Sequence, residues 1–126
     1  MSVKSDIKLH VGNWPGLVAK ISTRLYPLTL PQEPTLPAVT YFILAGTRDF
    51  AHDGDLGFSK FRIQFDSYGS TPEEVEQVIN EVISALAMWH STDPKYTVFP
   101  NTPQDFPEPE LSRFRMTMDA MVSHKE

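Results

Sequence analysis

The residues of this chain that could carry out chemistry are few, and the densest group is His52-Asp53-Gly54-Asp55, with Asp49 shortly before it. An imidazole and several carboxylates on a turn that glycine permits are suitable ligands for a metal ion. The group lacks the spaced acidic ladder and the closing Glu of an EF-hand loop, and no second histidine follows His52 at helical spacing. Asp-Gly is also a common pair in hairpin turns. We therefore interpret the group as a polar hairpin tip and predict neither a metal site nor a cofactor.

No other group of side chains predicts catalysis. The sequence contains no GxSxG, Walker, HExxH or GxGxxG motif, and it has no cysteine to act as a nucleophile. We expect structural or surface roles for the remaining histidines, which are His10, His90 and His124. The neighbouring Glu73 and Glu74 do not face each other on a helix, and capping explains both. The expected protein is not an enzyme.

Net charge and hydropathy argue against further classes of protein, those that bind nucleic acids and those that span a membrane. The 16 acidic and 11 basic residues give a net charge of −5, the wrong sign for a protein that binds phosphate backbones. The stretch Arg113-Phe114-Arg115 could stack on bases, but acidic residues lie close by, and an exposed strand face is the better interpretation. No apolar stretch is long enough to span a membrane, and the first residues lack the layout of a signal peptide. The absence of cysteine fits a reducing compartment.

The prolines divide the chain. Of the 11 prolines, nine fall in two patches, between residues 27 and 37 and between residues 94 and 109. Proline fixes φ and removes a backbone donor, so both patches are predicted to be extended or turning connections. The length predicts one domain.

Periodic apolar patterns predict the regular elements between these patches. Apolar residues at helical spacing predict helices over 14–25 and 72–89, the second of which has a capping signal at Ser70-Thr71-Pro72. Apolar or alternating runs predict strands over 38–45, 58–68 and 113–120, and a short one over 96–99. The predicted fold class is α+β: an antiparallel sheet of three to four strands with two helices packed on one face. A long hairpin tip over 46–57 and proline-rich connecting arms complete it.

Three quoted stretches carry a resemblance to a known family. They are YPLTLPQ…PTLPAVTY from residue 26, HDGDLG from residue 52 and FRIQFDSYGSTPEEVEQVINEVISAL from residue 61. In this order and spacing they resemble the tail-completion family of long-tailed bacteriophages and prophages, which also covers tail-terminator and head–tail joining proteins. The resemblance runs from about residue 11 to residue 86. The C-terminal third carries no distinctive motif.

The resemblance implies a structural virion protein without catalytic activity. Members of such families form a ring, usually a hexamer, that caps the finished tail tube and joins it to the head connector. The implied partners are therefore other copies of the chain, the tail tube protein and the connector, with DNA only passing through the lumen. The implied location is the tail or neck of a virion that is assembled in the bacterial cytoplasm.

Two sets of residues follow as candidates for contacts. Stiff connections lose little entropy on docking, so segments 26–37 and 93–110 are predicted to pack against neighbouring subunits. The candidate subunit contacts are Tyr26, Leu28, Leu30, Leu36, Tyr96, Phe99 and Phe106. The hairpin tip is predicted to dock on the tube end or to line the channel, where negative charge would repel passing DNA. Its candidate residues are Arg48, Asp49, Phe50, His52, Asp53, Asp55 and Leu56.

Two alternatives remain open. The tip could be a loose surface turn without a partner. The protein could also be a small α+β binding or regulatory module that self-associates through its sheet. Ring assemblies would favour the virion protein, and a ligand bound to a monomer or dimer would favour the module.

Overall fold

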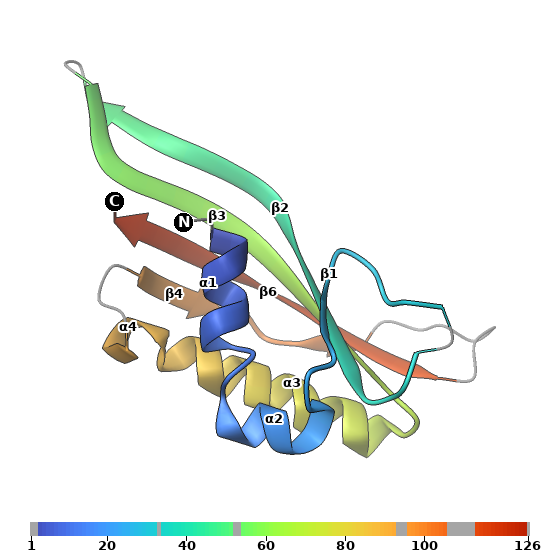
Figure 1. Ribbon diagram of the computed structural model, residues 1–126. Helices are drawn as coiled ribbons and strands as arrows, with labels where there is room; N and C mark the ends of the chain where they lie inside the picture. The colour runs from blue at the N-terminus through green and yellow to red at the C-terminus, as the bar shows by residue number, and fades with distance from the viewer. Residues whose placement is uncertain (1–2, 33, 52–53, 93–95, 106–112, 126) are drawn as a thin grey trace.

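A computed structural model describes residues 3–32, 34–51, 54–92, 96–105 and 113–125. The helices are α1 (Val3–His10), α2 (Pro15–Ile21), α3 (Pro72–Ala87) and α4 (Trp89–Thr92). The strands are β1 (Leu25–Pro27), β2 (Ala38–Ala51), β3 (Gly54–Gly69), β4 (Tyr96–Pro100), β5 (Gln104–Asp105) and β6 (Phe114–Lys125). These elements form an α+β fold, which confirms the predicted class (Figure 1). None of the described helices has the length and apolar character needed to cross a membrane.

The six strands form one mixed sheet in the order β1-β2-β3-β6-β4, with β5 paired to β6. The four longer strands pair antiparallel, whereas β1 runs parallel to β2. The prediction of an antiparallel sheet of three to four strands was therefore too simple. The two extra strands have only three and two residues and lie in the proline patches, where no alternating pattern is long enough to indicate a strand.

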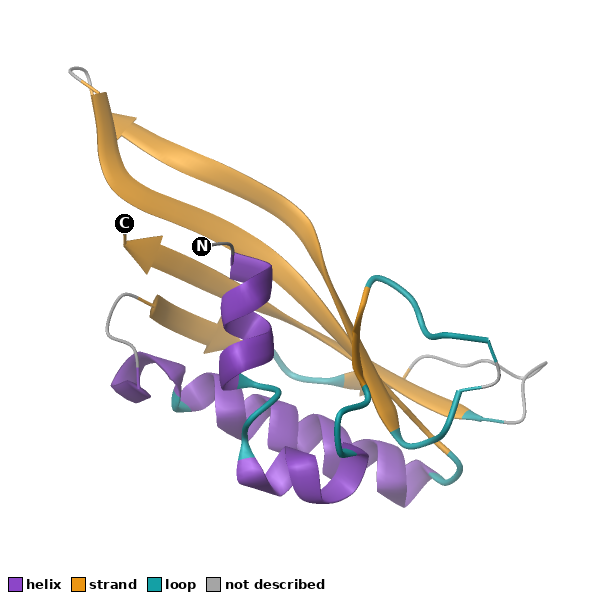
Figure 2. Cartoon of the chain, in the orientation of Figure 1, coloured by secondary structure: helices purple, strands orange, loops and turns teal. Residues whose placement is uncertain are grey.

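Helix α3 lies directly on the sheet, against β3, β4 and β6, and α2 packs against α3 (Figure 2). The apolar stripe of α3 is buried, as the spacing predicted: Val75, Val78, Ile79, Val82 and Leu86. Its start is capped on both sides of Thr71: Thr71 Oγ1 accepts from the Glu74 N–H at 3.2 Å, and Glu74 Oε1 accepts from the N–H of Ser70, one residue before the N-cap, at 2.9 Å. The helix ends at Ala87, close to the predicted position.

Helix α2 is shorter than predicted and ends at Ile21. The next residue, Ser22, takes φ 54°, which turns the chain out of the helix and towards β1. Trp14, just before the helix, donates from its indole Nε1 to Glu81 on α3 at 3.1 Å. This bond fixes α2 against α3 from its first residue.

Helix α1 was not predicted. Among its residues 5–10, whose burial the structure describes, Ile7 is the apolar residue that is fully buried, and one such residue gives no stripe for the sequence to show. It is held instead by a polar and aromatic cluster. Asp6 accepts a hydrogen bond from the Tyr96 hydroxyl, and His10 stacks on Trp89 with ring centroids 5.3 Å apart. Trp89 stacks in turn on Tyr96. The cluster joins the first helix to the connection after α3 and to β4.

The hairpin of β2 and β3 has a different tip from the one predicted. The predicted loop over 46–57 is mostly strand, because pairing continues from Gly46 opposite Phe61 to Ala51 opposite Gly54. Register shifts between Ile43 and Ala45 and near Asp49 break the alternation, which is why the sequence showed no strand there. The two strands therefore form one long hairpin that extends past the rest of the molecule (Figure 1).

Candidate functional site

The end of the β2–β3 hairpin is a two-stranded arm. Strand β6 accompanies β3 only as far as Lys125, which faces Phe58. Residues 49–51 and 54–57 lie beyond that point, and β2 and β3 there pair only with each other among the described residues. We call these residues the arm.

The arm contains most of the residues predicted to contact the tube or the lumen. Arg48 lies at its base opposite Ser59, and Asp49 and Phe50 follow on β2. Asp55, which pairs with Phe50, and Leu56 lie on β3. His52 and Asp53 lie outside the described residues, so the expectation of a polar turn there remains a prediction. Backbone pairing thus brings the described members of this set onto one narrow projection.

Within the part of the chain that the structure describes, no three His, Asp or Glu side chains are grouped in a way that could hold a metal ion. Two acidic residues, Asp66 and Asp119, lie near each other in the main part of the sheet, on the face that turns away from the helices. There they are matched by cations rather than by one another.

The first of these ion pairs joins β3 to β6. Arg62 Nε lies 2.5 Å from Asp119 Oδ2, and Asn101 Nδ2 donates to Asp119 Oδ1 at 2.7 Å. The hydrogen bond from Asn101, together with the hydrogen bond and charge of Arg62, holds the pKa of Asp119 below its usual value. The carboxylate therefore stays charged and fastens the strand before β5 to the centre of the sheet.

A second ion pair is buried nearby. Asp66 has only 1% of its side chain exposed, and its Oδ2 lies 2.8 Å from Arg115. Gln64 also donates to both carboxylate oxygens, at 3.0 and 3.1 Å. The guanidinium groups of Arg115 and Arg113 lie over the ring of Tyr68. The predicted strand over this stretch is confirmed, and Arg113 and Arg115 are half-buried on it rather than fully exposed.

The predicted subunit contacts divide into exposed, half-buried and buried residues. Leu28 and Phe99 have 60% and 64% of their surface exposed. Tyr26, Leu30 and Leu36 are half-buried, and Phe106 lies outside the described residues. Tyr96 is fully buried in the core of its own chain, so its side chain offers no surface to a neighbour. The short strand over 96–99 was predicted, but its sequence did not show that Tyr96 faces the core.

Met121 is an exposed apolar residue that was not among the predicted contacts. Met121, with 42% of its surface exposed, lies directly opposite Phe99 in the β4–β6 ladder. The predicted strand stopped at residue 120, one residue too early to include it. Continued alternation from Arg115 and Asp119 would have placed Met121 on the same outer face.

No family model matches this sequence, and no curated protein matches it. Among solved structures, a crystal structure of a protein from Akkermansia muciniphila is similar over 69% of this chain, with 8% sequence identity and a TM-score of 0.37. The chain spans 42% of the length of that protein. A likeness at this level supports no inference about function.

Proposed function

We propose that this chain is a structural virion protein that forms a ring on the end of a phage tail tube and joins the tail to the head connector. The ring is a homo-oligomer, a hexamer by the family resemblance. The proposal assigns no reaction to the protein. It assigns contact roles to the arm and to the exposed residues of the proline-rich connections.

The arm is the observation that carries the proposal. A two-stranded hairpin is only marginally stable in water when nothing packs on it. Here the pairing of β2 with β3 continues past Phe58 and Lys125, where the described pairing of β3 with β6 stops. A projection of this kind gains its stability when it lies against another molecule, as a docking element on a tube or in a ring would.

The positions of the family-like stretches support the same function. The stretch from Tyr26 covers part of β1 and the connection to β2, and the stretch that begins at His52 includes the β3 side of the arm. The third stretch, from Phe61, covers β3 and α3, which hold the arm and the connection in place. The resemblance therefore falls on the projecting parts and on their support.

A shortened arm tests the proposal. Arg48 and Ser59 face each other, so replacing residues 49–58 by Asn-Gly closes the hairpin with a two-residue turn and removes the arm. The variant and the wild type are supplied to a phage or prophage strain that lacks the gene. Electron microscopy measures tail length and head joining, and infectious titre measures completed particles.

We expect the shortened protein to fold but to give tails of irregular length or tails without heads. Leu9→Ser, on the exposed surface of α1, is the matched control and should give normal particles. Normal, joined tails from the shortened variant would contradict the proposal and favour the self-associating binding module.

A further inference from the structure

Strand β2 contains one residue that has no partner opposite it on β3. Ile43 faces Ile63 in the described ladder. The next residue of β3, Arg62, faces Ala45, so Leu44 is an extra residue between two consecutive positions of β3. On both sides of Leu44 the pairing is regular. An extra residue of this kind is a β-bulge, which bends the strand and increases its twist.

The ladder on the other side of β3 has no such interruption. Strand β3 pairs with β6 in unbroken register from Phe58 to Gly69. Arg62, which lies opposite the bulge, faces Met121 in that ladder and donates to Asp119 on β6. Strand β3 is therefore held on β6 at the point where β2 has its extra residue. The added length of about 3.3 Å, one strand residue, is taken up by β2, so the hairpin curves with β2 on the outside.

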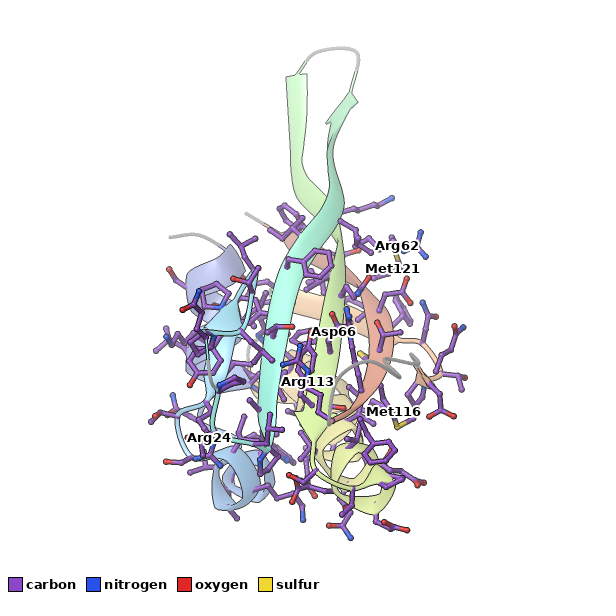
Figure 3. All side chains as sticks on the ribbon, turned by 90° about the vertical axis from the view of Figure 1, so that its right-hand side faces the viewer. Arg24, Arg62, Asp66, Arg113, Met116 and Met121 are labelled. Carbon is purple, nitrogen blue, oxygen red and sulfur yellow. The ribbon has the colours of Figure 1, made fainter. Side chains whose placement is uncertain are left out.

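The path of the hairpin has this curve. In Figure 1, β2 changes direction near the middle of its length and lies on the outer side of the bend. Figure 3, a view turned by 90°, shows the two strands twisted about each other beyond Arg62 and Met121. The bulge comes before the arm, which begins at residue 49. The direction in which the arm leaves the sheet is therefore set by residues that precede it.

A second irregularity near the tip lies on the opposite strand. Asp49 faces Phe58, but the next residue of β2, Phe50, faces Asp55, so residues 56–57 of β3 are extra. Here β3 is the longer strand, and Figure 1 shows the hairpin turning back near its tip with β3 on the outside. The two irregularities bend the hairpin in opposite directions, which agrees with the strand that is longer in each case.

The side chain of Leu44 does not explain why the residue is there. It is 45% exposed, whereas Val39, Tyr41 and Ile43 on the same strand belong to the core or pack against it. What Leu44 adds is backbone length at one position of β2. Bulges next to functional sites change the direction of a strand or of a side chain.

We infer that Leu44 is a positioning residue, which fixes the direction of the arm by lengthening β2, and that the arm engages the tail tube only in that direction. The inference rests on the docking role proposed for the arm. It adds that the arm must be correctly aimed as well as present.

Deletion of Leu44 tests the inference. Because Leu44 lies outside the ladder, every other residue of β2 keeps its present partner on β3 in the deletion variant, and the protein should fold. Leu44→Ala is the matched control, since it keeps the extra residue and removes most of the side chain. Thermal unfolding, with cross-strand nuclear Overhauser effects on both sides of position 44, checks that the sheet is retained.

Spin labels measure the direction of the arm, because the chain has no native cysteine. Asp55→Cys labels the arm and Asn80→Cys labels the exposed face of α3. We expect deletion of Leu44 to shift the mean distance between the labels by about 3 Å or more, and Leu44→Ala to leave it unchanged. Deletion of residues 56–57 removes the opposite bend and should shift the distance with the opposite sign. This second deletion tests the link between extra residues and bending even if the first variant does not fold.

The complementation assay measures the consequence for docking. We expect deletion of Leu44 to give tails of irregular length or tails without heads, and Leu44→Ala to give joined tails. A label distance that the deletions leave unchanged would overturn the inference. If the deletion variant also self-associates where the wild type does not, the bulge protects the open edge of β2 instead. Equal defects in the deletion variant and in Leu44→Ala would also overturn it, because they would assign the effect to the side chain.

The shortened arm separates this inference from the proposed function. Joined tails from the Leu44 deletion with a shifted label distance, together with defective tails from the shortened arm, would overturn the inference alone. Normal tails from the shortened arm would overturn the proposed function itself.

Discussion

At the scale of single residues, the face of the sheet away from the helices is organised by ion pairs that cross from β3 to β6. Asp66 is buried and satisfied by Arg115 and Gln64, and Asp119 is held by Arg62 and Asn101. These bonds join β3 to β6 in the main part of the sheet. They also occupy the carboxylates that would otherwise be candidates for chemistry.

Removing one member of the buried Asp66–Arg115 ion pair should lower the free energy of unfolding. Asp66→Leu leaves the Arg115 guanidinium without its carboxylate, and we expect the free energy of unfolding to fall by about 3 kcal/mol. The double variant Asp66→Leu/Arg115→Met removes both charges and should recover most of that loss. Urea unfolding measures all three proteins, with Asp105→Leu on exposed β5 as a control expected near wild type. Equal losses in the single and double variants would show that the pairing itself contributes little.

Asp119 should make stability depend on pH in acid. Its folded-state pKa is lowered, first by the hydrogen bond from Asn101 and then by Arg62, so the carboxylate stabilises the fold above its unfolded pKa of about 3.9. This contribution is lost as the pH falls through the folded-state pKa. The difference in unfolding free energy between wild type and Asp119→Asn should therefore be constant near neutral pH and shrink below about pH 4.

Asn101→Ala provides the internal check on that prediction. Without the Asn101 hydrogen bond the folded-state pKa of Asp119 moves up towards its ordinary value. The pH interval over which the Asp119 carboxylate stops stabilising the fold therefore becomes narrower. Urea unfolding at a series of pH values measures the range. A difference between wild type and Asp119→Asn that does not change with pH would refute the assignment.

At the scale of elements, α1 is the helix whose position depends most on a few contacts. Apart from Ile7, it is held by the Asp6–Tyr96 hydrogen bond, the stacking of His10 on Trp89 and a bond between His10 Nε2 and the Ala85 carbonyl oxygen at 2.6 Å. Its last turn is closed by the N–H of Gly12, which donates to the Lys8 carbonyl oxygen at 3.1 Å. The backbone geometry at Gly12 therefore affects whether α1 can reach its contacts with Trp89 and Tyr96.

Two glycine substitutions should distinguish a new Cβ that collides with backbone from one that collides with a side chain. A Cβ on Gly12 would collide with the Lys8 carbonyl oxygen, which belongs to the backbone and cannot move without distorting α1. A Cβ on Gly16 would collide with the end of the Glu81 side chain, which can swing away at the cost of its bond to Trp14. We expect Gly12→Ala to cost about 3 kcal/mol and Gly16→Ala about 1 kcal/mol.

Urea unfolding and amide hydrogen exchange measure this pair. In Gly12→Ala the amides of α1 should lose protection while those of α3 keep it, because α3 retains its own contacts with the sheet. An equal loss of stability in the two variants would contradict the distinction between backbone and side-chain contact.

The sequence predicted the elements that bury a periodic apolar face. Helix α3 and strands β2, β3, β4 and β6 all contain such a face, and all were predicted. No such face is visible in the sequences of α1, β1 and β5. In α1 the apolar residue described as fully buried is Ile7, and β1 and β5 have three and two residues, so the hydrophobic pattern is too short to show a period. The arm was predicted as a loop because its strands are irregular where glycine and register shifts occur.

At the scale of the whole molecule, the residues that would face a partner could be predicted only in part. Leu28 and Phe99, which were selected from the proline-rich connections, are exposed, and their contact role stays a prediction. The same reasoning selected Tyr96, because a sequence does not show which side of a short strand faces the core. It also could not show that Leu28 and Phe99 lie at opposite ends of the sheet, since that depends on the strand order. Strand order, and not the local sequence pattern, therefore decides which exposed side chains can share one surface.

The strand order also affects how the chain folds during synthesis. The last strand, β6, lies between β3 and β4 and is not at an edge of the sheet. Asp6 also cannot form its hydrogen bond until Tyr96 has been synthesised, 90 residues later. While the ribosome is still adding residues 114–125, the nascent chain has an open sheet edge on β3 and no place for β4 to pair. Only a chain that already contains residues 114–125 can therefore hold β4 in the sheet, so the surface that β4 and β6 share does not exist before those residues are made.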